Sequence, residues 1–104
     1  MHRVAFKMTL YKGFAGEYKN RHERLWPDLE RALKEAGISD YSIFLDEETN
    51  TLFGVLKANE QHLLDQLPDN PVMQQWWQYM SDIMETNDDN SPVTVTLEEV
   101  FHMP

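Results

Sequence analysis

The chain contains no cysteine, which excludes disulfide bonds, thiolate catalysis and thiolate metal sites. It has only four glycines, and it shows no Gly-rich phosphate loop, nucleophile elbow or dinucleotide fingerprint. No stretch approaches the ~20 apolar residues of a membrane span. No long apolar run follows residues 1–6, as it would in a signal peptide. We therefore expect a cytoplasmic, reducing compartment.

Basic residues are also few, with 9 Lys and Arg against 18 Asp and Glu, for a formal net charge of -9. Phosphate backbones and anionic lipid surfaces repel a protein this acidic, so we expect neither nucleic acid nor a membrane as a partner. The four histidines show no close ligand spacing, and Asp88 and Asp89 lack the spacing of a calcium loop. No metal site is expected.

The length of 104 residues predicts one domain over residues 1–104. Apolar residues alternate over residues 3–10, which predicts a half-buried strand. Apolar positions then recur at 3.6-residue spacing over about residues 14–36, which predicts a helix with either a kink or a fresh start at Pro27. Gly37 is a natural helix stop.

The second half of the chain is predicted to add three strands and a second helical region. Residues 40–46 and 51–57 are predicted to form a hairpin, and residues 93–101 a last strand. Between them, a helical region begins near Glu60 and is interrupted at Pro68 and Pro71. The last part of this helical region is predicted to place six residues on one face: Met73, Trp76, Trp77, Met80, Ile83 and Met84.

This order predicts an α+β fold, the ferredoxin-like βαββαβ arrangement, with an antiparallel sheet and two helices on one face. Phe44, Phe53 and Val55 are predicted to point to the sheet face opposite the one that carries the other apolar residues of their strands. Both sheet faces therefore carry apolar groups. A chain of this length has no further element to cover the second face. We therefore expect a homodimer in which two sheets meet.

Tyr18, His22 and Trp26 lie four residues apart, which on a helix stacks them along one side. That side falls inside the apolar arc, so His22 is predicted to point inward. A single inward histidine is more often a core residue than a catalyst, although inward titratable groups are enriched at functional sites. The spacing leaves both interpretations open.

The pair Trp76-Trp77 is a second candidate feature. Adjacent helical residues point about 100° apart, so one indole is expected to pack in the core and the other to border a cavity or an interface. Sugars favour indole surfaces, which stack on C–H groups and donate an N–H. A packing role for both indoles remains open, as does a solvent-exposed tip for Tyr41.

Four segments together resemble the L-rhamnose mutarotase family: residues 18–29, the pair Trp76-Trp77, and residues 87–92 and 99–101. The likeness spans essentially the whole chain without insertions. It implies a cytoplasmic homodimer of ferredoxin-like subunits, a dimeric α/β barrel. Such a protein interconverts the α and β anomers of L-rhamnopyranose by acid–base ring opening, without a cofactor. It further implies that His22 is the proton donor and that Tyr18, Tyr41, Trp76 and Trp77 bind the sugar.

Histidine titrates near neutral pH, so it can donate a proton in one direction and accept it in the other. We expect His22 to act as the general acid that protonates the ring oxygen. The group that takes the anomeric proton stays open among a tyrosine hydroxyl, a water and a carboxylate such as Asp89. Two other functions are compatible with the fold: a dimeric ferredoxin-like monooxygenase or haem-binding protein, with a histidine as axial ligand, and a non-catalytic sugar-binding domain. A purely structural dimerisation module is a third.

Overall fold

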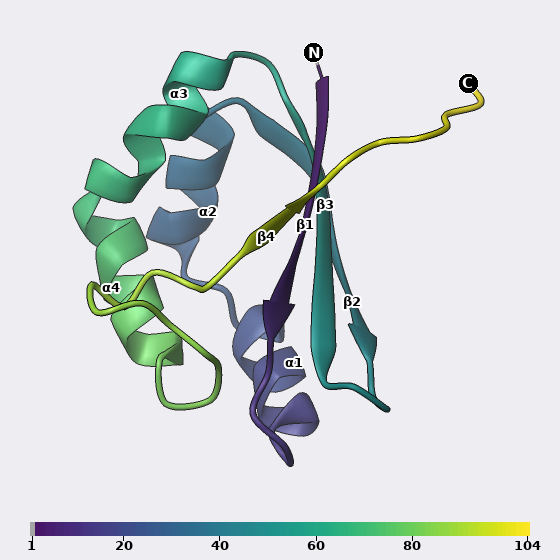
Figure 1. The fold of residues 1–104 in the computed structure, drawn as a ribbon. Coiled ribbons are helices and arrows are strands. Elements are labelled where there is room, and N and C mark those ends of the chain that lie inside the picture. The colour runs from purple at the N-terminus through teal and green to yellow at the C-terminus, as the bar shows by residue number, and fades with distance from the viewer. Residues whose placement is uncertain (1) are drawn as a thin grey trace.

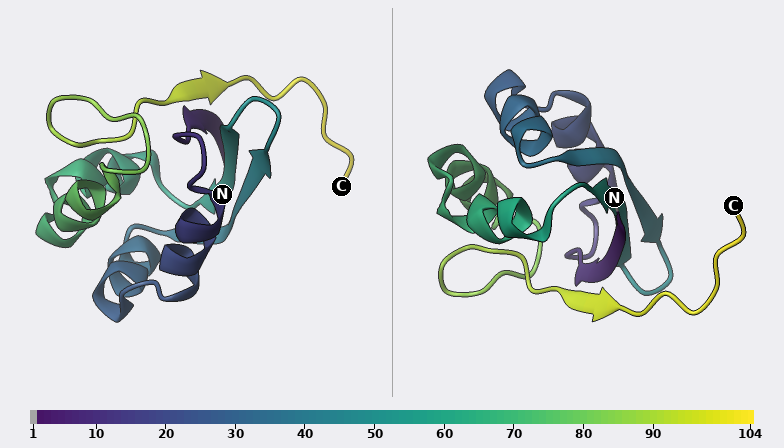
Figure 2. Two further views of the ribbon diagram at one scale, coloured as in Figure 1. Left: turned by 90° about the horizontal axis from the view of Figure 1, so that it is seen from below. Right: turned by 90° about the horizontal axis from the view of Figure 1, so that it is seen from above.

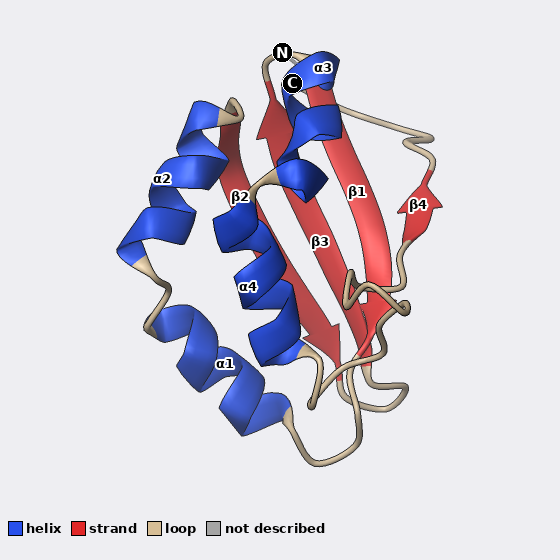
Figure 3. Ribbon diagram, turned by 90° about the vertical axis from the view of Figure 1, so that its left-hand side faces the viewer, coloured by secondary structure: helices blue, strands red, loops and turns tan. Residues whose placement is uncertain are grey.

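One antiparallel sheet with helices on one face forms the molecule (Figures 1 and 3). The computed structural model describes residues 2–104, so Met1, the first residue of the predicted domain, lies outside the described residues. The sheet within that range has the strand order β2-β3-β1-β4. The strands are β1 (His2–Thr9), β2 (Ile38–Asp46), β3 (Thr51–Ala58) and β4 (Val95–Leu97). The helices are α1 (Ala15–Glu23), α2 (Pro27–Glu35), α3 (Gln61–Gln66), the 3-10 helix η1 (Leu67–Asp69) and α4 (Pro71–Met80).

This topology confirms the predicted α+β, ferredoxin-like arrangement. Strand β1 pairs with both β3 and β4, and β2 pairs with β3 at the edge. Figure 2 shows the helices gathered on one side of the sheet. The main core lies between the helices and the sheet. Its fully buried residues are Leu10, Leu29, Leu52, Met80 and Ile83.

The first helical stretch is broken in two. Helix α1 ends at Glu23, and α2 begins at Pro27 after Trp26, which has extended backbone angles (φ -62°, ψ 131°). A residue before proline avoids the helical region, and proline suits a first helical turn, so the fresh start is the alternative that is confirmed. Gly37 follows α2 with φ +81°, as a helix stop requires. Trp26 is therefore not on α1, and the prediction that it shares one helix side with Tyr18 and His22 is wrong.

The second helical region is interrupted at Pro68 and Pro71, as predicted. Helix α4 is capped by Asn70, whose side-chain oxygen accepts hydrogen bonds from the Val72 and Met73 amides at 2.9 and 3.3 Å. The helix ends at Met80, so the prediction that Ile83 and Met84 continue its face is wrong. Both are buried all the same, because the chain turns back onto the sheet there and Met84 pairs with Leu10.

The last strand is shorter than predicted. Strand β4 covers three residues of the expected 93–101, because its register with β1 extends only over Ala5, Phe6 and Lys7. Residues 98–104 continue as a tail without strand pairing, although Glu99 still accepts a hydrogen bond from Arg3 of β1 at 3.0 Å, and the C-terminus lies away from the body of the protein (Figure 1). The exposed side chains of this tail include Val100, Phe101 and Met103.

The face of the sheet opposite the helices is partly apolar, as predicted. Phe44 lies directly opposite Phe53 in the register of β2 and β3, and Val55 follows on the same face of β3. Phe44 is 63% exposed and Val95 on β4 is 50% exposed. Both faces of the sheet therefore carry apolar side chains.

Candidate active site

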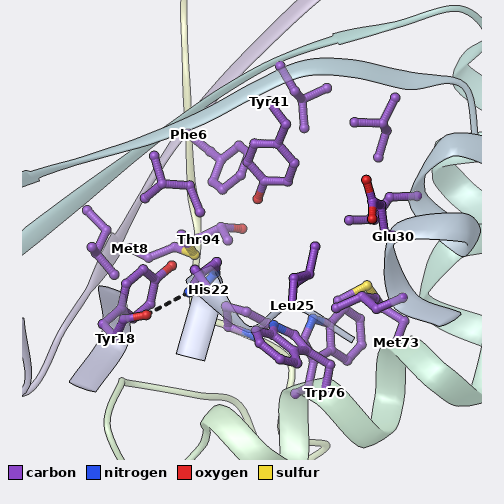
Figure 4. Close-up of a pocket in the computed structure, with 18 of the residues that line it drawn as sticks. Phe6, Met8, Tyr18, His22, Leu25, Glu30, Tyr41, Met73, Trp76 and Thr94 are labelled. Carbon is purple, nitrogen blue, oxygen red and sulfur yellow. Dashed lines mark hydrogen bonds between the residues drawn. The ribbon is translucent and has the colours of Figure 1, made fainter. Parts of the chain in front are cut away.

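A cavity of about 1300 Å³ lies between the sheet and the helices (Figure 4). Its walls are mostly apolar, with a few polar groups, as is usual for small-molecule sites. The volume exceeds the ~300–1,000 Å³ of a typical pocket, so a monosaccharide would fill only part of it. The residues expected at the site all line this one cavity: Tyr18, His22, Tyr41, Trp76 and Trp77.

His22 is half-buried at the end of α1 and is held by two aromatic neighbours. Its ring is stacked on Tyr18 with centroids 4.3 Å apart, and it meets Trp76 edge-on at 5.4 Å. Its Nδ1 lies 2.9 Å from the main-chain oxygen of Tyr18. A carbonyl only accepts, so Nδ1 carries its hydrogen in both charge states. Nε2 is therefore the nitrogen left to exchange a proton.

The surroundings of His22 also set its charge. Burial lowers its pKa from the ordinary 6.5, and the hydrogen bond to the Tyr18 carbonyl only partly opposes this effect. The imidazole is therefore mainly neutral at pH 7. In that state Nε2 accepts a proton first and donates it afterwards, as the imidazolium.

Tyr18 and Tyr41 place two phenol groups in the same cavity. Burial raises the pKa of Tyr18 above its ordinary 10, and the nearby Tyr41 adds to the effect. Burial raises the pKa of Tyr41 to about 12. Although 39% of Tyr41 is exposed, its hydroxyl points into the cavity (Figure 4). Both phenols stay protonated near neutral pH and can donate hydrogen bonds.

An irregularity in β2 places Tyr41 on the helix side. The register of β2 against β3 shifts between Ser39 and Ser42, and Asp40 has φ +46°. In a regular strand, residues three positions apart, such as Ile38 and Tyr41, point to opposite faces. The extra residue of the bulge brings Tyr41 to the same face as Ile38. Its ring then meets Phe6 edge-on, with centroids 6.3 Å apart.

The two adjacent indoles differ in burial, as expected. Trp76 is 6% exposed and packs in the core, whereas Trp77 is half-buried, and both border the cavity. Trp26 packs edge-on against Trp76 at 5.1 Å, although it lies outside α1. Trp77 is therefore the more accessible indole surface for a sugar ring.

Asp89 does not line the cavity. Its carboxylate accepts hydrogen bonds from the Ser91 amide, at 3.0 Å, and from the Ser91 hydroxyl, and these bonds lower its pKa. The same segment does bring Asn87, Ser91 and Thr94 to the cavity wall. Sequence reasoning had not named these as site residues. Asn87 and Ser91 fall inside the segment that carries the family likeness, whereas Thr94 has no local signal.

Within residues 2–104, no group of three or more His, Cys, Asp or Glu side chains is placed to hold a metal ion. None of the helices in this range is both long enough and apolar enough to cross a membrane.

The sequence model of the L-rhamnose mutarotase family matches residues 3–103. The chain belongs to this family. It is 59% identical over 103 residues to an L-rhamnose mutarotase from Sinorhizobium fredii, a match that covers 99% of each chain. The crystal structure of an L-rhamnose mutarotase from Formosa agariphila superposes with a TM-score of 0.93, at 51% identity and 100% coverage of both chains.

The fold itself is shared more widely. A putative antibiotic biosynthesis monooxygenase from Nitrosomonas europaea superposes with a TM-score of 0.63, covering 95% of this chain and 89% of its own. The identity is only 9%, so the likeness shows the fold alone. It gives no support to a monooxygenase or haem-binding function for this member of the mutarotase family.

Proposed function

We propose that this cavity is where the chain interconverts the α and β anomers of L-rhamnopyranose. One observation carries this assignment: His22 has its Nδ1 fixed on a carbonyl and its Nε2 free, in a cavity with two phenols and two indoles. Membership of the L-rhamnose mutarotase family supplies the substrate. The reaction requires only proton transfer, so we assign no cofactor.

Neutral His22 starts the reaction as a proton acceptor. Its Nε2 takes the proton of the anomeric hydroxyl while the bond from C1 to the ring oxygen breaks, and C1 becomes an aldehyde. The ring oxygen receives a proton from a tyrosine hydroxyl or a water. After rotation about C1–C2, the new hydroxyl attacks the other face of C1 and returns its proton to the tyrosinate or hydroxide left by the first step, while the imidazolium protonates the new anomeric oxygen. His22 thus donates its proton to the anomeric oxygen and not, as expected from the sequence, to the ring oxygen, because its lowered pKa leaves the imidazole neutral at the start. A well-placed group of this kind contributes typically ~10²–10⁴-fold.

Four residues are proposed to bind the sugar. Tyr18 and Tyr41 remain protonated and so can donate hydrogen bonds to sugar oxygens. Trp77 presents a half-buried indole to the cavity, and Trp76 forms the wall behind His22. Indole faces stack on the C–H groups of a pyranose, which suits a ligand with both polar and apolar edges.

The assembly proposed for the protein is a homodimer of single-domain, cytoplasmic subunits. The sheet face that carries Phe44 and Phe53 has no helix over it in Figure 2, and the tail adds the exposed Phe101. Two such faces packed together would bury these side chains and form a dimeric α/β barrel. Cell fractionation tests the location, and limited proteolysis tests the single domain.

The first experiment measures anomer exchange of L-rhamnose by NMR saturation transfer. Wild-type protein is compared with His22→Ala and with His62→Ala, which changes an exposed histidine on α3. We expect exchange well above the buffer rate in the wild type and in His62→Ala, and its loss in folded His22→Ala. Exchange that survives His22→Ala would remove the histidine from its role. No acceleration by the wild type would refute the activity.

A further inference from the structure

Helix α1 carries Tyr18 and His22 but has few apolar anchors. It is nine residues long, and the residues it buries are Tyr18 and Arg21. Isolated helices shorter than ~12–15 residues are marginal in water, so tertiary contacts must hold such a helix in place. The position of α1 therefore depends on the contacts of Arg21 as well as on those of Tyr18.

Arg21 is only 9% exposed, and its guanidinium makes contacts on several sides. Nε donates to Glu17 Oε2 at 3.0 Å on the same helix. Nη1 donates to the main-chain oxygen of Tyr79 at 2.7 Å and to Asp82 Oδ1 at 2.9 Å, and Nη2 donates to Asp82 Oδ2 at 3.3 Å. The guanidinium also lies over the Tyr79 ring, 4.4 Å from its centroid. Arg21 thereby ties α1 to the C-terminal end of α4.

This tie joins the two helices that carry most of the proposed site. Helix α4 bears Trp76 and Trp77, and Figure 3 shows α1 beside its C-terminal end. Arg21 is the residue before His22, whose ring meets Trp76 at 5.4 Å. A shift of α1 along or away from α4 would change the distance between the His22 and Trp76 rings.

We propose that Arg21 is a positioning residue, which holds α1 on α4 so that His22 and Trp76 keep their relative placement. This inference rests on the proposed function of the cavity. The planar fork of arginine reaches a carboxylate with two nitrogens while a third serves another acceptor, and a lysine ammonium cannot reproduce that geometry. A displacement of about 1 Å in a site can cost ~10²-fold in rate, so a modest movement of α1 would be visible in kcat.

The test compares Arg21→Met, Arg21→Lys and Asp82→Ala in the anomer-exchange assay. Arg31→Met is the matched control, because Arg31 is an exposed arginine on α2 whose partner is Asp28 on the same helix. We expect kcat to fall by about 10²-fold in Arg21→Met and about tenfold in Arg21→Lys, with KM changing less than kcat. Arg31→Met should stay within about twofold of the wild type.

Asp82→Ala separates positioning from loss of folding. The Asp82 side chain is 66% exposed, so its removal leaves the core intact while it takes away two of the contacts of Arg21. We expect a loss of kcat of several-fold, with unchanged far-UV circular dichroism. A folded Asp82→Ala or Arg21→Met protein with the kcat of the control would overturn the proposal.

An NMR titration of the His22 ring protons gives a readout that does not depend on activity. If Arg21 positions the ring, the midpoint or the chemical shifts of His22 move in folded Arg21→Met and Asp82→Ala but not in Arg31→Met. Unchanged His22 signals in both variants would overturn the inference. If the wild type showed no exchange at all, the proposed function would fall, and this titration would still decide the role of Arg21.

Discussion

The imidazole of His22 is stacked on the Tyr18 ring, with centroids 4.3 Å apart, while its Nδ1 lies 2.9 Å from the main-chain oxygen of the same tyrosine. One residue, a helical turn away, thus supports both the orientation of the ring and the choice of its tautomer. Proton transfer then falls to Nε2. An acid–base site of this kind depends on the ring being held without being charged.

The pH dependence of the reaction follows from the burial of His22. Burial disfavours the charged imidazolium, so its pKa lies below 6.5 and the neutral form predominates above that pKa. We expect kcat/KM to rise with pH through a midpoint below 6.5 and to level off by about pH 7. Exchange measured from about pH 4.5 to 8, with the buffer rate subtracted at each pH, checks this. A flat profile would contradict the assignment of His22.

The adjacent indoles provide a matched pair of variants. Trp76 is buried in the core, so Trp76→Ala should lower the free energy of unfolding by ~3–5 kcal/mol. Trp77 is half-buried beside the cavity, so Trp77→Ala should cost less stability and raise KM for the sugar. Urea denaturation and exchange kinetics measure the two effects. Equal losses of stability, or an unchanged KM in Trp77→Ala, would contradict this division of roles.

Gly54 gives Phe6 its place in the cavity wall. The two residues are opposite in the β1–β3 register, and a Cβ on Gly54 would come within 2.5 Å of Phe6 Cζ. In Gly54→Ala the Phe6 ring, which meets Tyr41 edge-on, must move, so we expect a loss of ~1–3 kcal/mol in unfolding free energy and a raised KM.

The control for this variant is Gly16→Ala on α1. A Cβ there meets nothing within 4 Å, and alanine in a helix is better than glycine by ~0.5–1 kcal/mol. Thermal unfolding should therefore show a lower Tm for Gly54→Ala and an equal or higher Tm for Gly16→Ala. A Gly54→Ala protein as stable as the wild type would show that Phe6 has room to adjust.

The proposed dimer makes a prediction about the open sheet face. Phe44 lies opposite Phe53 and is 63% exposed in a single chain, so Phe44→Glu should prevent two such faces from packing. We expect the wild type to sediment as a dimer and Phe44→Glu as a folded monomer. Tyr11→Glu, at an exposed position outside the strands, is the control and should remain dimeric. A wild-type monomer at assay concentration would refute the dimer.

Much of the local structure was readable from short stretches of sequence. Tyr18 and His22 were placed together by helical spacing, and the break before Pro27 and the stop at Gly37 follow from backbone sterics of neighbouring residues. The order of strands and helices along the chain predicted the antiparallel βαββαβ fold. The likeness to one family then named the candidate site residues.

The sequence by itself determined the order and type of the helices and strands, and which residues carry proton-transfer and stacking chemistry, because these depend on neighbours within a few positions. Only the tertiary structure decided the rest. The shifted register of β2 turns Tyr41 into the cavity, Thr94 reaches it from a distant segment, and β4 stops at Leu97 although β1 continues beyond its partner Ala5. Arg21 contacts Tyr79 and Asp82, which lie 58 and 61 positions further along the chain. Such contacts arise only when the chain folds back on itself, so the spacing of residues within a short stretch of sequence does not predict them.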